Sequence, residues 1–467
     1  MSQRRRSNNR YAQKPARSTK GKDSFSALDV ELAKVAKQER VLAENFAALN
    51  LPGSVIQILT KANITKPSPI QSSAIPDVLA GKDLLGRAET GSGKTYAFGL
   101  PTLVKLAGKK AKSGSPLALI MVPTRELAQQ VNDALAPVAS ALNLKITTIY
   151  GGASMQRQHQ ALKRGVEIVV ATPGRLEDHM RQRTVNLNEL EICILDEADH
   201  MAEMGFMPSM TRILDLVPKN SQNLLFSATL DRGVSTLVKN YLKTPALHAV
   251  EKQKQSESNM EHLAFIVEKT EKVNIIAEIT KRPARTLLFV KTKYGAEKLA
   301  NNLEKSGIEA TAIHGDRSQS QRNRALSDFS SGRKRVLVAT DVAARGIHVD
   351  GVDLVVHVDP PQEWKDYIHR SGRTARAGSK GVALSLLSSN ETRAYAKMQT
   401  EFGNQVTPIK VRTKDAAVTA IATSGEVIVI KPEAIRPNSI RRPDGKPKNK
   451  RNFRQFDRKK AKVSQTR

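Results

Sequence analysis

A short glycine-rich segment at residues 88–95 (AETGSGKT) has the composition of a phosphate-binding loop. Gly91 and Gly93 let backbone amides approach phosphate oxygens, and a helix that begins directly afterwards adds its positive dipole. The ammonium group of Lys94 can contact the outer phosphates during catalysis, and the Thr95 hydroxyl can bind Mg²⁺. The alternative is a Gly/Ser turn that caps a helix. The residues predicted to bind a nucleoside triphosphate are Ala88, Glu89, Thr90, Gly91, Ser92, Gly93, Lys94 and Thr95.

Two adjacent carboxylates, Asp196 and Glu197, follow the apolar run at 192–195 (ICIL). A strand that ends in two carboxylates suits a nucleotide-bound Mg²⁺, because Asp196 can hold the ion through water while Glu197 deprotonates the attacking water. Both are predicted to be catalytic, and Asp196 and Thr95 are the predicted Mg²⁺ residues. Alone, the DEAD tetrapeptide at 196–199 is also a common acidic start of a helix. Its combination with a phosphate loop favours the catalytic interpretation.

The elements that must position these residues form two series of short β-branched runs, which alternate with longer helical segments. This pattern is typical of parallel sheets with helices on both faces. The first series of predicted strands lies at 117–122, 146–150, 166–171, 192–195 and 223–227, and the second at 286–290, 310–314, 335–339, 354–358 and 381–387. The sequence therefore predicts two α/β domains, at 23–249 and 261–410, joined by a polar linker at 250–260. Apolar residues at helical spacing, from Leu28 to Ala36, predict a helix that lies on the first domain.

The composition indicates a globular protein with a polyanionic partner. The chain has 467 residues, of which 39% are hydrophobic and 26% are charged, and such a length predicts two domains plus tails. Seventy-five Lys and Arg residues against 45 Asp and Glu residues give a net charge of +30. The expected partner is a nucleic acid, and an anionic membrane surface is the weaker alternative.

Both ends of the chain are strongly basic. Residues 1–22 hold eight basic and no acidic side chains, and residues 431–467 hold fourteen basic and three acidic ones, so the ends carry +19 of the +30. Because large apolar residues are scarce there, we expect a disordered basic arm at 1–22 and a basic, largely disordered extension at 411–467. The alternatives are a solubilising charge run and, at the N-terminus, an organelle transit peptide.

Cysteine usage and hydropathy predict a cytoplasmic location. Cys193 is the single cysteine and lies in an apolar run, which excludes an intrachain disulfide and predicts a buried thiol in a reducing compartment. No apolar signal-peptide core follows Met1, and no uncharged apolar run of about 18 residues could span a bilayer. No Cys/His cluster has metal-ligand spacing, so Mg²⁺ that arrives with the nucleotide is the only metal predicted.

Four motifs occur in the order and at roughly the distances found in the DEAD-box RNA helicases. They are AETGSGKT at 88–95, DEAD at 196–199, SAT at 227–229 and HRSGRTAR at 369–376. The chain closely resembles this family over residues 44–400. The resemblance implies an α/β fold of two tandem RecA-like domains with disordered basic tails. Compact length and short basic extensions look more typical of bacterial members.

The resemblance also implies roles in ATP binding and catalysis. The segment 44–72 matches the adenine-recognition motif, in which Lys66 takes part, Gln71 would pair with the adenine edge and Phe46 would pack on the base, so ATP should be preferred over GTP. The alternative is that Phe46 is a core residue. Gly346 joins the nucleotide set from the second domain. The family's arginine fingers match Arg373 and Arg376, and the relay between the domains matches Ser227, Thr229, His369 and Arg370.

Further matches imply an RNA track with no group shaped to read base edges, so binding should be nearly independent of sequence. On the first domain these residues are Pro123, Thr124, Arg125, Gly151, Gly152, Thr172, Pro173, Gly174 and Arg175, and on the second they are Gly315, Gln319, Arg322 and Thr340. Three positions depart from the common pattern: Glu89 replaces glutamine, Ala375 replaces glycine, and His348 replaces an aspartate that approaches the ribose.

The function implied is an ATP-dependent RNA helicase, with ATP and Mg²⁺ as its ligands. RNA would stimulate ATP hydrolysis, which would drive local, non-processive opening of short duplexes or remodelling of RNA–protein complexes. Expected partners are single-stranded RNA backbone and short duplexes, and ribonucleoprotein or ribosomal assembly intermediates are candidate targets. One alternative is an ATP-gated RNA-binding clamp or chaperone with slow hydrolysis, and another is a DNA helicase built on the same motor.

Overall fold

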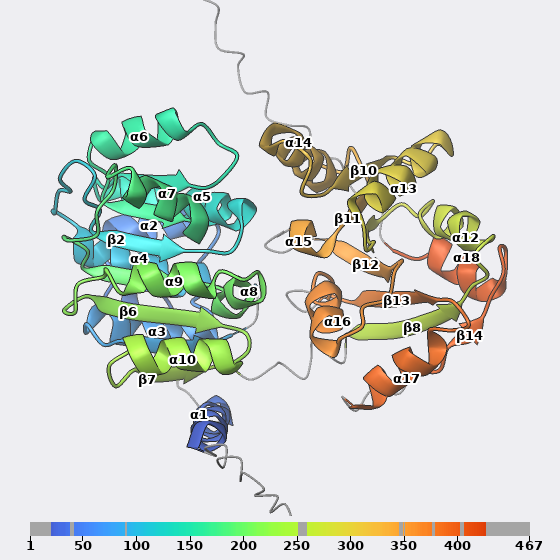
Figure 1. Ribbon diagram of the computed structural model, residues 1–467, viewed down its shortest axis with the longest axis horizontal. Coiled ribbons are helices and arrows are strands. Elements are labelled where there is room, and N and C mark those ends of the chain that lie inside the picture. The colour runs from blue at the N-terminus through green and yellow to red at the C-terminus, as the bar shows by residue number, and fades with distance from the viewer. Residues whose placement is uncertain are drawn as a thin grey trace, which may run out of the picture. The chain divides into compact units, whose positions relative to one another are not determined.

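The computed structural model describes residues 20–37, 42–88, 91–250, 259–344, 349, 351–375, 379–401 and 406–425. Two seven-stranded sheets form its framework, and every pair of neighbouring strands is parallel (Figure 1). We call residues 42–250 the first lobe and residues 259–425 the second lobe. The predicted fold class, two α/β domains in tandem, is confirmed.

The first lobe has the strand order β3-β4-β2-β5-β6-β1-β7. Its strands are β1 (Leu84–Arg87), β2 (Ala118–Met121), β3 (Ile146–Ile149), β4 (Ile168–Ala171), β5 (Ile192–Leu195), β6 (Gln222–Ser227) and β7 (Ala246–Ala249). Its helices are α2 (Gly53–Lys61), α3 (Pro69–Leu79), α4 (Lys94–Leu106), α5 (Arg125–Ala141), α6 (Met155–Lys163), α7 (Pro173–Arg181), α8 (Ala198–Glu203), α9 (Met207–Leu214) and α10 (Arg232–Tyr241), preceded by α1 (Lys20–Lys37) and a short 3-10 turn η1 (Ala47–Leu49).

The second lobe repeats this topology, because its order β10-β11-β9-β12-β13-β8-β14 is that of the first sheet with every strand number raised by seven. The strands are β8 (Met260–Ile266), β9 (Arg285–Phe289), β10 (Ala310–Ile313), β11 (Val336–Ala339), β12 (Val352–His357), β13 (Gly381–Leu387) and β14 (Ile409–Lys410). The helices are α12 (Lys272–Ile279), α13 (Lys293–Lys305), α14 (Gln319–Ser330), α15 (Asp341–Ala344), α16 (Trp364–Ser371), α17 (Thr392–Glu401) and α18 (Ala416–Ala422).

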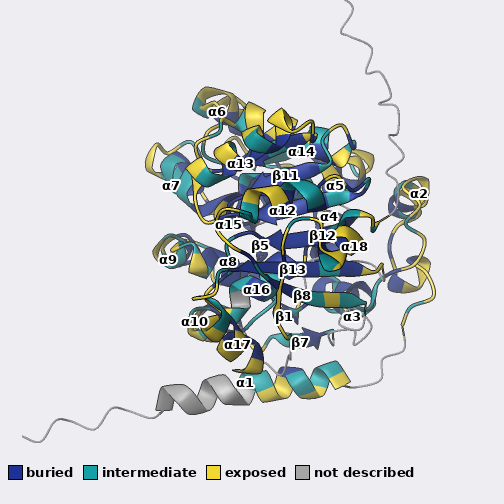
Figure 2. Ribbon diagram, turned by 90° about the vertical axis from the view of Figure 1, so that its right-hand side faces the viewer, coloured by how far each residue is buried: buried dark blue, intermediate teal, exposed yellow. Residues whose placement is uncertain are grey.

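Alternation along the central strands explains why each sheet is covered on both faces. In β5, Ile192 and Ile194 pack with helices α2 to α5, whereas Cys193 and Leu195 pack with α7 to α10. All four residues are buried, as expected for a strand between two helical layers (Figure 2). The thiol of Cys193 is fully buried, and burial raises its pKa to about 12, which confirms the predicted buried thiol.

Four strands were absent from the sequence prediction: β1, β7, β8 and β14. Each lacks a clear β-branched run, since β7 and β8 contain His248 and His262, and β14 has only two residues. Their pairing partners specify them, as β1 lies between β6 and β7 and β8 lies between β13 and β14. The predicted linker reaches one residue too far, because β8 already begins at Met260.

The tails differ from the prediction at both ends. The helix α1 begins at Lys20, inside the predicted basic arm, and its Leu32 is fully buried next to β7. Residues 409–425 belong to the second lobe, because Val411 and Val418 are buried in its core and α18 packs on α12. The prediction that a largely disordered extension begins at residue 411 was therefore wrong for residues 411–425. Residues 1–19 and 426–467 lie outside the described residues.

Among the helices that are described, none is long and apolar enough to cross a membrane.

Candidate functional site

The phosphate loop joins the carboxyl end of β1 to the first turn of α4. Gly91 and Gly93 have φ angles of +92° and +93°, in the left-handed region that glycine adopts without steric cost. Lys94 follows directly and is buried; its Nζ donates to the carbonyl oxygen of Ala88 at 3.0 Å and lies 3.9 Å from Oδ1 of Asp196. A buried ammonium group at a helix N-terminus makes this loop electropositive, as a phosphate ligand requires. Glu89 and Thr90 lie outside the described residues, and Ser92 and Thr95 are half-buried.

The predicted adenine-recognition segment contacts this loop through Gln71. The side-chain oxygen of Gln71 accepts from the Ser68 amide at 2.9 Å, and its Nε2 donates to the Gly93 carbonyl oxygen at 3.0 Å. The side-chain amide of Gln71 keeps a second lone pair and a second N–H, so it can still form hydrogen bonds with the edge of a base. Lys66 is exposed. Phe46 is only 2% exposed and packs in the core, so its position favours the core alternative over packing on a base.

Asp196 follows β5 and is 2% exposed. Burial raises the pKa of Asp196 to about 6, even though the nearby charge of Lys94 acts to lower it. Burial disfavours the charged form of this carboxylate and Lys94 offsets that effect only in part, so a divalent cation would add stabilising positive charge. Oxygen donors from Asp196 and from the Thr95 hydroxyl suit Mg²⁺, so the residues present fit this ion.

Glu197 is buried, and its backbone adopts a φ of +54°. This conformation costs a residue other than glycine about 1–2 kcal/mol, and such strain is concentrated at functional sites. Its Oε2 lies 2.9 Å from Nδ1 of His200. Burial acts to raise the pKa of Glu197, but the hydrogen bond from His200 and the charges of His200, Lys94 and Arg373 outweigh burial, so its pKa lies well below the usual value. The carboxylate is therefore ionised and can accept a proton.

The last acidic residue of the DEAD sequence connects it to the SAT segment. Oδ2 of Asp199 accepts from the backbone amide of Thr229 at 2.8 Å and from its hydroxyl at 2.9 Å. The Ser227 hydroxyl donates to the Thr229 carbonyl oxygen at 2.6 Å. Side-chain hydrogen bonds thus join the segments that follow β5 and β6. A movement of one segment would therefore shift the other.

In the second lobe, α16 carries His369 and Arg370, which were predicted to act as a relay, and Arg373 follows the end of this helix. Arg370 forms a two-bond ion pair with Asp341, at 2.6 and 2.8 Å, and donates to the Asp359 carbonyl oxygen at 2.7 Å. Its guanidinium lies 5.3 Å from the ring centroid of Phe289. Arg370 is therefore held inside its own lobe, where it fixes the orientation of the helix end. The charge of Arg373, which is 5% exposed, acts on Glu197 of the first lobe.

The structure describes only some of the residues predicted for the site in the second lobe. Arg376, Gly346 and His348 lie outside the described residues, so their predicted roles stay predictions. Ala375 has a φ of +52°, a left-handed conformation that explains why glycine is the commoner residue at this position.

The predicted RNA residues of the first lobe cluster where β2, β3 and β4 end. The Thr124 hydroxyl caps α5 by accepting from the Leu127 amide at 3.2 Å. The guanidinium of Arg125 lies so close to Gly152 that a β-carbon there would collide with it. Arg175 donates to the Ala153 carbonyl oxygen at 3.1 Å. The carboxyl ends of parallel strands form one edge of a sheet, so this edge gathers the remaining predicted residues too: Pro123, Gly151, Thr172, Pro173 and Gly174.

Residues predicted for RNA binding in the two lobes also contact each other. Nε of Arg322 lies 2.7 Å from Oε1 of Glu126, and both side chains are buried. Gln319 donates to the same oxygen at 3.2 Å and accepts from Arg125 at 3.4 Å. Gly315 lies beside Lys293, and Thr340 is buried after β11. Glu126 thus pairs with Arg322, a cation that was predicted to bind phosphate.

We expect Arg322→Ala to weaken RNA binding about tenfold or more. Loss of a charge-assisted hydrogen bond costs about 1.5–3 kcal/mol, and the Glu126 carboxylate would be left buried without its cation. The measurement is a fluorescence-anisotropy titration of single-stranded RNA. The matched control is Arg324→Ala, because Arg324 lies on the same helix with 86% of its side chain exposed. Equal losses for both variants would show that only the net charge of α14 matters.

Two residues at the site had no role in the sequence prediction. His200 follows the DEAD sequence directly and lies between Glu197 and His369, with its Nε2 3.3 Å from Nδ1 of His369. Glu126 connects α5 to α14. The only available signal was their place inside or next to a motif, since a contact across two lobes has no spacing in the sequence.

Two family models match the chain. The one described as DEAD/DEAH box helicase matches residues 68–237, and the helicase conserved C-terminal domain matches residues 271–378. A protein of Arabidopsis thaliana named DEAD-box ATP-dependent RNA helicase 30 is 39% identical over 372 residues. This chain belongs to the DEAD-box family. The match covers 78% of the chain and 63% of the Arabidopsis protein, so the chain spans under two thirds of that relative's length.

Solved structures of two other proteins share the fold. Dbp5 of S. cerevisiae bound to RNA and ADP BeF3 has a TM-score of 0.70 and 29% identity, covering 82% of this chain and 100% of that chain. Mss116p bound to single-stranded RNA and AMP-PNP has a TM-score of 0.71 and 25% identity, with 84% and 85% covered. The predicted bacterial type has no support from relatives in a plant and in S. cerevisiae.

Proposed function

We propose that the protein is an ATP-dependent RNA helicase that couples RNA-stimulated ATP hydrolysis to local opening of RNA duplexes or remodelling of RNA–protein complexes. The observation that carries this proposal is the meeting of a buried phosphate-loop lysine, an ionised Glu197 and the charge of Arg373 in one place. These three groups come from different elements of the two lobes. The relatives named above support the same activity.

In the proposed mechanism, Glu197 orients the attacking water and accepts its proton. Lys94 and the loop amides bind the outer phosphates, and Arg373 stabilises negative charge on the transferring phosphoryl group. Mg²⁺ held by Thr95 and Asp196 would neutralise phosphate charge when bound. His200 keeps Glu197 oriented and ionised, so it is a positioning residue.

Coupling to RNA follows from the division of each site between two lobes. A ligand that contacts both lobes favours the arrangement in which they are together, and so raises the affinity of the other ligand. Bound strand and nucleotide would thus assist each other. Base-pair steps average about 1.4 kcal/mol, taken from DNA stacking, so one such event can open roughly a helical turn or less. This supports local opening in place of long processive travel.

The proposed RNA contacts are to the sugar–phosphate backbone. Glycine amides, hydroxyls and the guanidinium groups of Arg125, Arg175 and Arg322 suit phosphates and offer no pattern for a base edge. Dbp5 and Mss116p are each bound to RNA in the structures named above. We also propose a cytoplasmic location, and ribonucleoprotein or ribosomal assembly intermediates as targets.

The test is a comparison of ATP hydrolysis with RNA and with single-stranded DNA of the same sequence. We expect strong stimulation by RNA and little by DNA, because the 2′-hydroxyl distinguishes the two backbones. Equal stimulation would indicate a DNA helicase on the same motor. Hydrolysis that stays slow with RNA, while RNA is bound tightly under ATP, would indicate the clamp.

Deleting residues 431–467 is expected to weaken RNA binding and to flatten its salt dependence by up to several phosphate contacts. The segment has fourteen basic and three acidic residues, and each neutralised phosphate adds to the salt slope. Affinities are measured between about 50 and 200 mM salt. The matched control keeps the length of the segment but replaces its Lys and Arg residues with Gln. If the full-length and truncated chains have equal salt slopes, the segment only aids solubility.

A further inference from the structure

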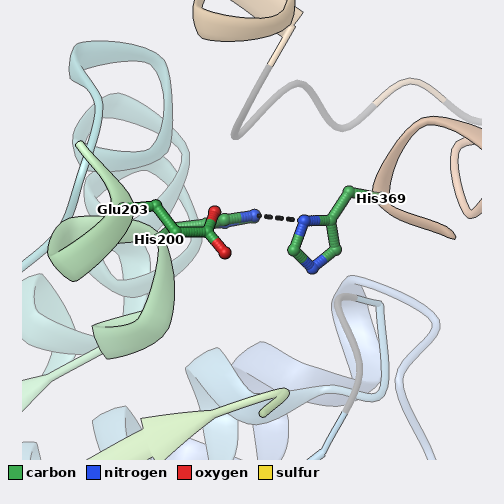
Figure 3. Close-up of side chains that lie close together, drawn as sticks. All are labelled: His200, Glu203 and His369. Carbon is green, nitrogen blue, oxygen red and sulfur yellow. Dashed lines mark hydrogen bonds between the residues drawn. The ribbon is translucent and has the colours of Figure 1, made fainter. Parts of the chain in front are cut away.

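Two histidines and a glutamate from different lobes meet beside the hydrolytic site. His200 and Glu203 lie on α8 of the first lobe, and His369 lies on α16 of the second (Figure 3). One ligand atom from each of the three lies within 4.8 Å of the other two. We propose that these residues form a regulatory site for a transition-metal ion that prefers imidazole, with Zn²⁺ as the first candidate.

The spacing of the two imidazoles suits one shared ion. Nε2 of His200 lies 3.3 Å from Nδ1 of His369. Two nitrogens that each lie about 2.0–2.1 Å from a tetrahedral Zn²⁺ are about 3.3 Å apart. The rings meet edge to face, with an angle of 71° between their planes, so they are not stacked in a way that would hide the nitrogens. The Glu203 carboxylate supplies the third ligand, and a fourth position is left for water.

A second observation concerns the tautomer of His200. Its Nδ1 lies 2.9 Å from the Glu197 carboxylate, which can only accept a hydrogen bond when it is ionised. When the ring is neutral, its proton must therefore lie on Nδ1, and the lone pair of Nε2 is then directed at His369. A carboxylate that fixes the tautomer of a metal-binding histidine is the usual outer partner at such sites.

The ligand set separates this site from the predicted Mg²⁺ site. Mg²⁺ prefers oxygen ligands and gives up its water reluctantly, whereas imidazole suits Zn²⁺, Co²⁺ and Ni²⁺. The millimolar Mg²⁺ that accompanies ATP should not displace the ion from two imidazoles. The competing interpretation is an ordinary hydrogen bond between the two rings, in which one donates and the other accepts.

The site would act on hydrolysis in two ways. An ion bound to both α8 and α16 stabilises the contact between the lobes, and this raises the affinity for any ligand that needs the same contact. An ion on Nε2 also makes Nδ1–H of His200 a stronger donor to Glu197, so the carboxylate becomes a weaker base. Zn²⁺ is therefore expected to slow ATP hydrolysis while RNA binding under ATP is maintained or strengthened.

The experiment measures metal binding directly, on the untagged full-length chain. Zn²⁺ is titrated by calorimetry. Co²⁺ is titrated by its visible absorption, which distinguishes a four-coordinate ion from a six-coordinate one. Trp364, the only tryptophan, begins the helix that carries His369, so its fluorescence gives a third readout. We expect one ion per chain, and binding about tenfold or more weaker in both Glu203→Gln and His200→Gln. The matched control Glu268→Gln changes an exposed glutamate of the second lobe and should bind normally.

Equal Zn²⁺ and Co²⁺ binding by the wild type, Glu203→Gln and His200→Gln would overturn the proposal, as would no binding at all. Circular dichroism shows whether a variant that loses the ion is still folded, and Glu203→Gln changes only one helix-end carboxylate. Binding does not depend on turnover, so a chain that binds the ion but shows no RNA-stimulated hydrolysis would contradict the proposed function and leave this site standing.

Discussion

Glu197→Gln is expected to slow RNA-stimulated ATP hydrolysis by about 10²–10⁴-fold, the usual contribution of a positioned general base. The amide oxygen of glutamine can still accept the hydrogen bond from His200, so the local fold should persist. What is lost is a group that can take a proton from water. Steady-state phosphate release with saturating RNA measures the effect, and nucleotide binding should change little.

The matched control for this change is Glu189→Gln, an exposed glutamate of the same lobe that pairs with Lys112. It should hydrolyse ATP at the wild-type rate. Duplex separation by Glu197→Gln at the full wild-type rate with ATP would contradict the enzymatic account, because the energy source would then be something other than hydrolysis.

Arg373→Ala is expected to lower the rate of hydrolysis by about 10³–10⁵-fold, which is the usual contribution to kcat of an arginine that acts on a transferring phosphoryl group. Arg373 is 5% exposed, and its charge lowers the pKa of Glu197, so it acts at the base as well. Its loss removes positive charge at the moment when negative charge develops. Single-turnover measurements should show that the rate of the chemical step falls while ATP affinity stays within a few-fold.

Arg393→Ala is the control for the second lobe, because Arg393 is exposed on α17. It should leave hydrolysis unchanged. If Arg373→Ala retained the wild-type rate, catalysis would have to rest on the first lobe alone.

Local sequence patterns were sufficient to predict the buried central strands of the sheets. Each of β2, β4 and β5 is an apolar run whose four residues are all buried, so strand periodicity and composition identified them. The edge strand β14, with two exposed residues, has no such signal and depends on pairing with β8. The same holds for residues 411–425, whose large apolar residues Val411, Val418 and Ile421 are buried in the core of the second lobe, where α18 packs on α12.

The residues of the site also fall into two groups: those that a local motif predicts and those that only the tertiary structure reveals. Lys94, Asp196 and Glu197 were predicted because each lies in a contiguous motif at the end of a strand. Phe46 was assigned to the base, yet it is buried, since residues upstream of a helix can face either the core or a ligand. The approach of His200 to His369 joins positions 169 residues apart, and no spacing rule reaches so far.

The central claim is that hydrolysis needs groups from both lobes and that RNA assembles them. The most direct measurement is the rate of phosphate release by the full-length chain at saturating ATP, with and without single-stranded RNA. The account predicts a slow rate without RNA, a much faster rate with RNA, and loss of this stimulation in Arg373→Ala. Equal rates with and without RNA would contradict it.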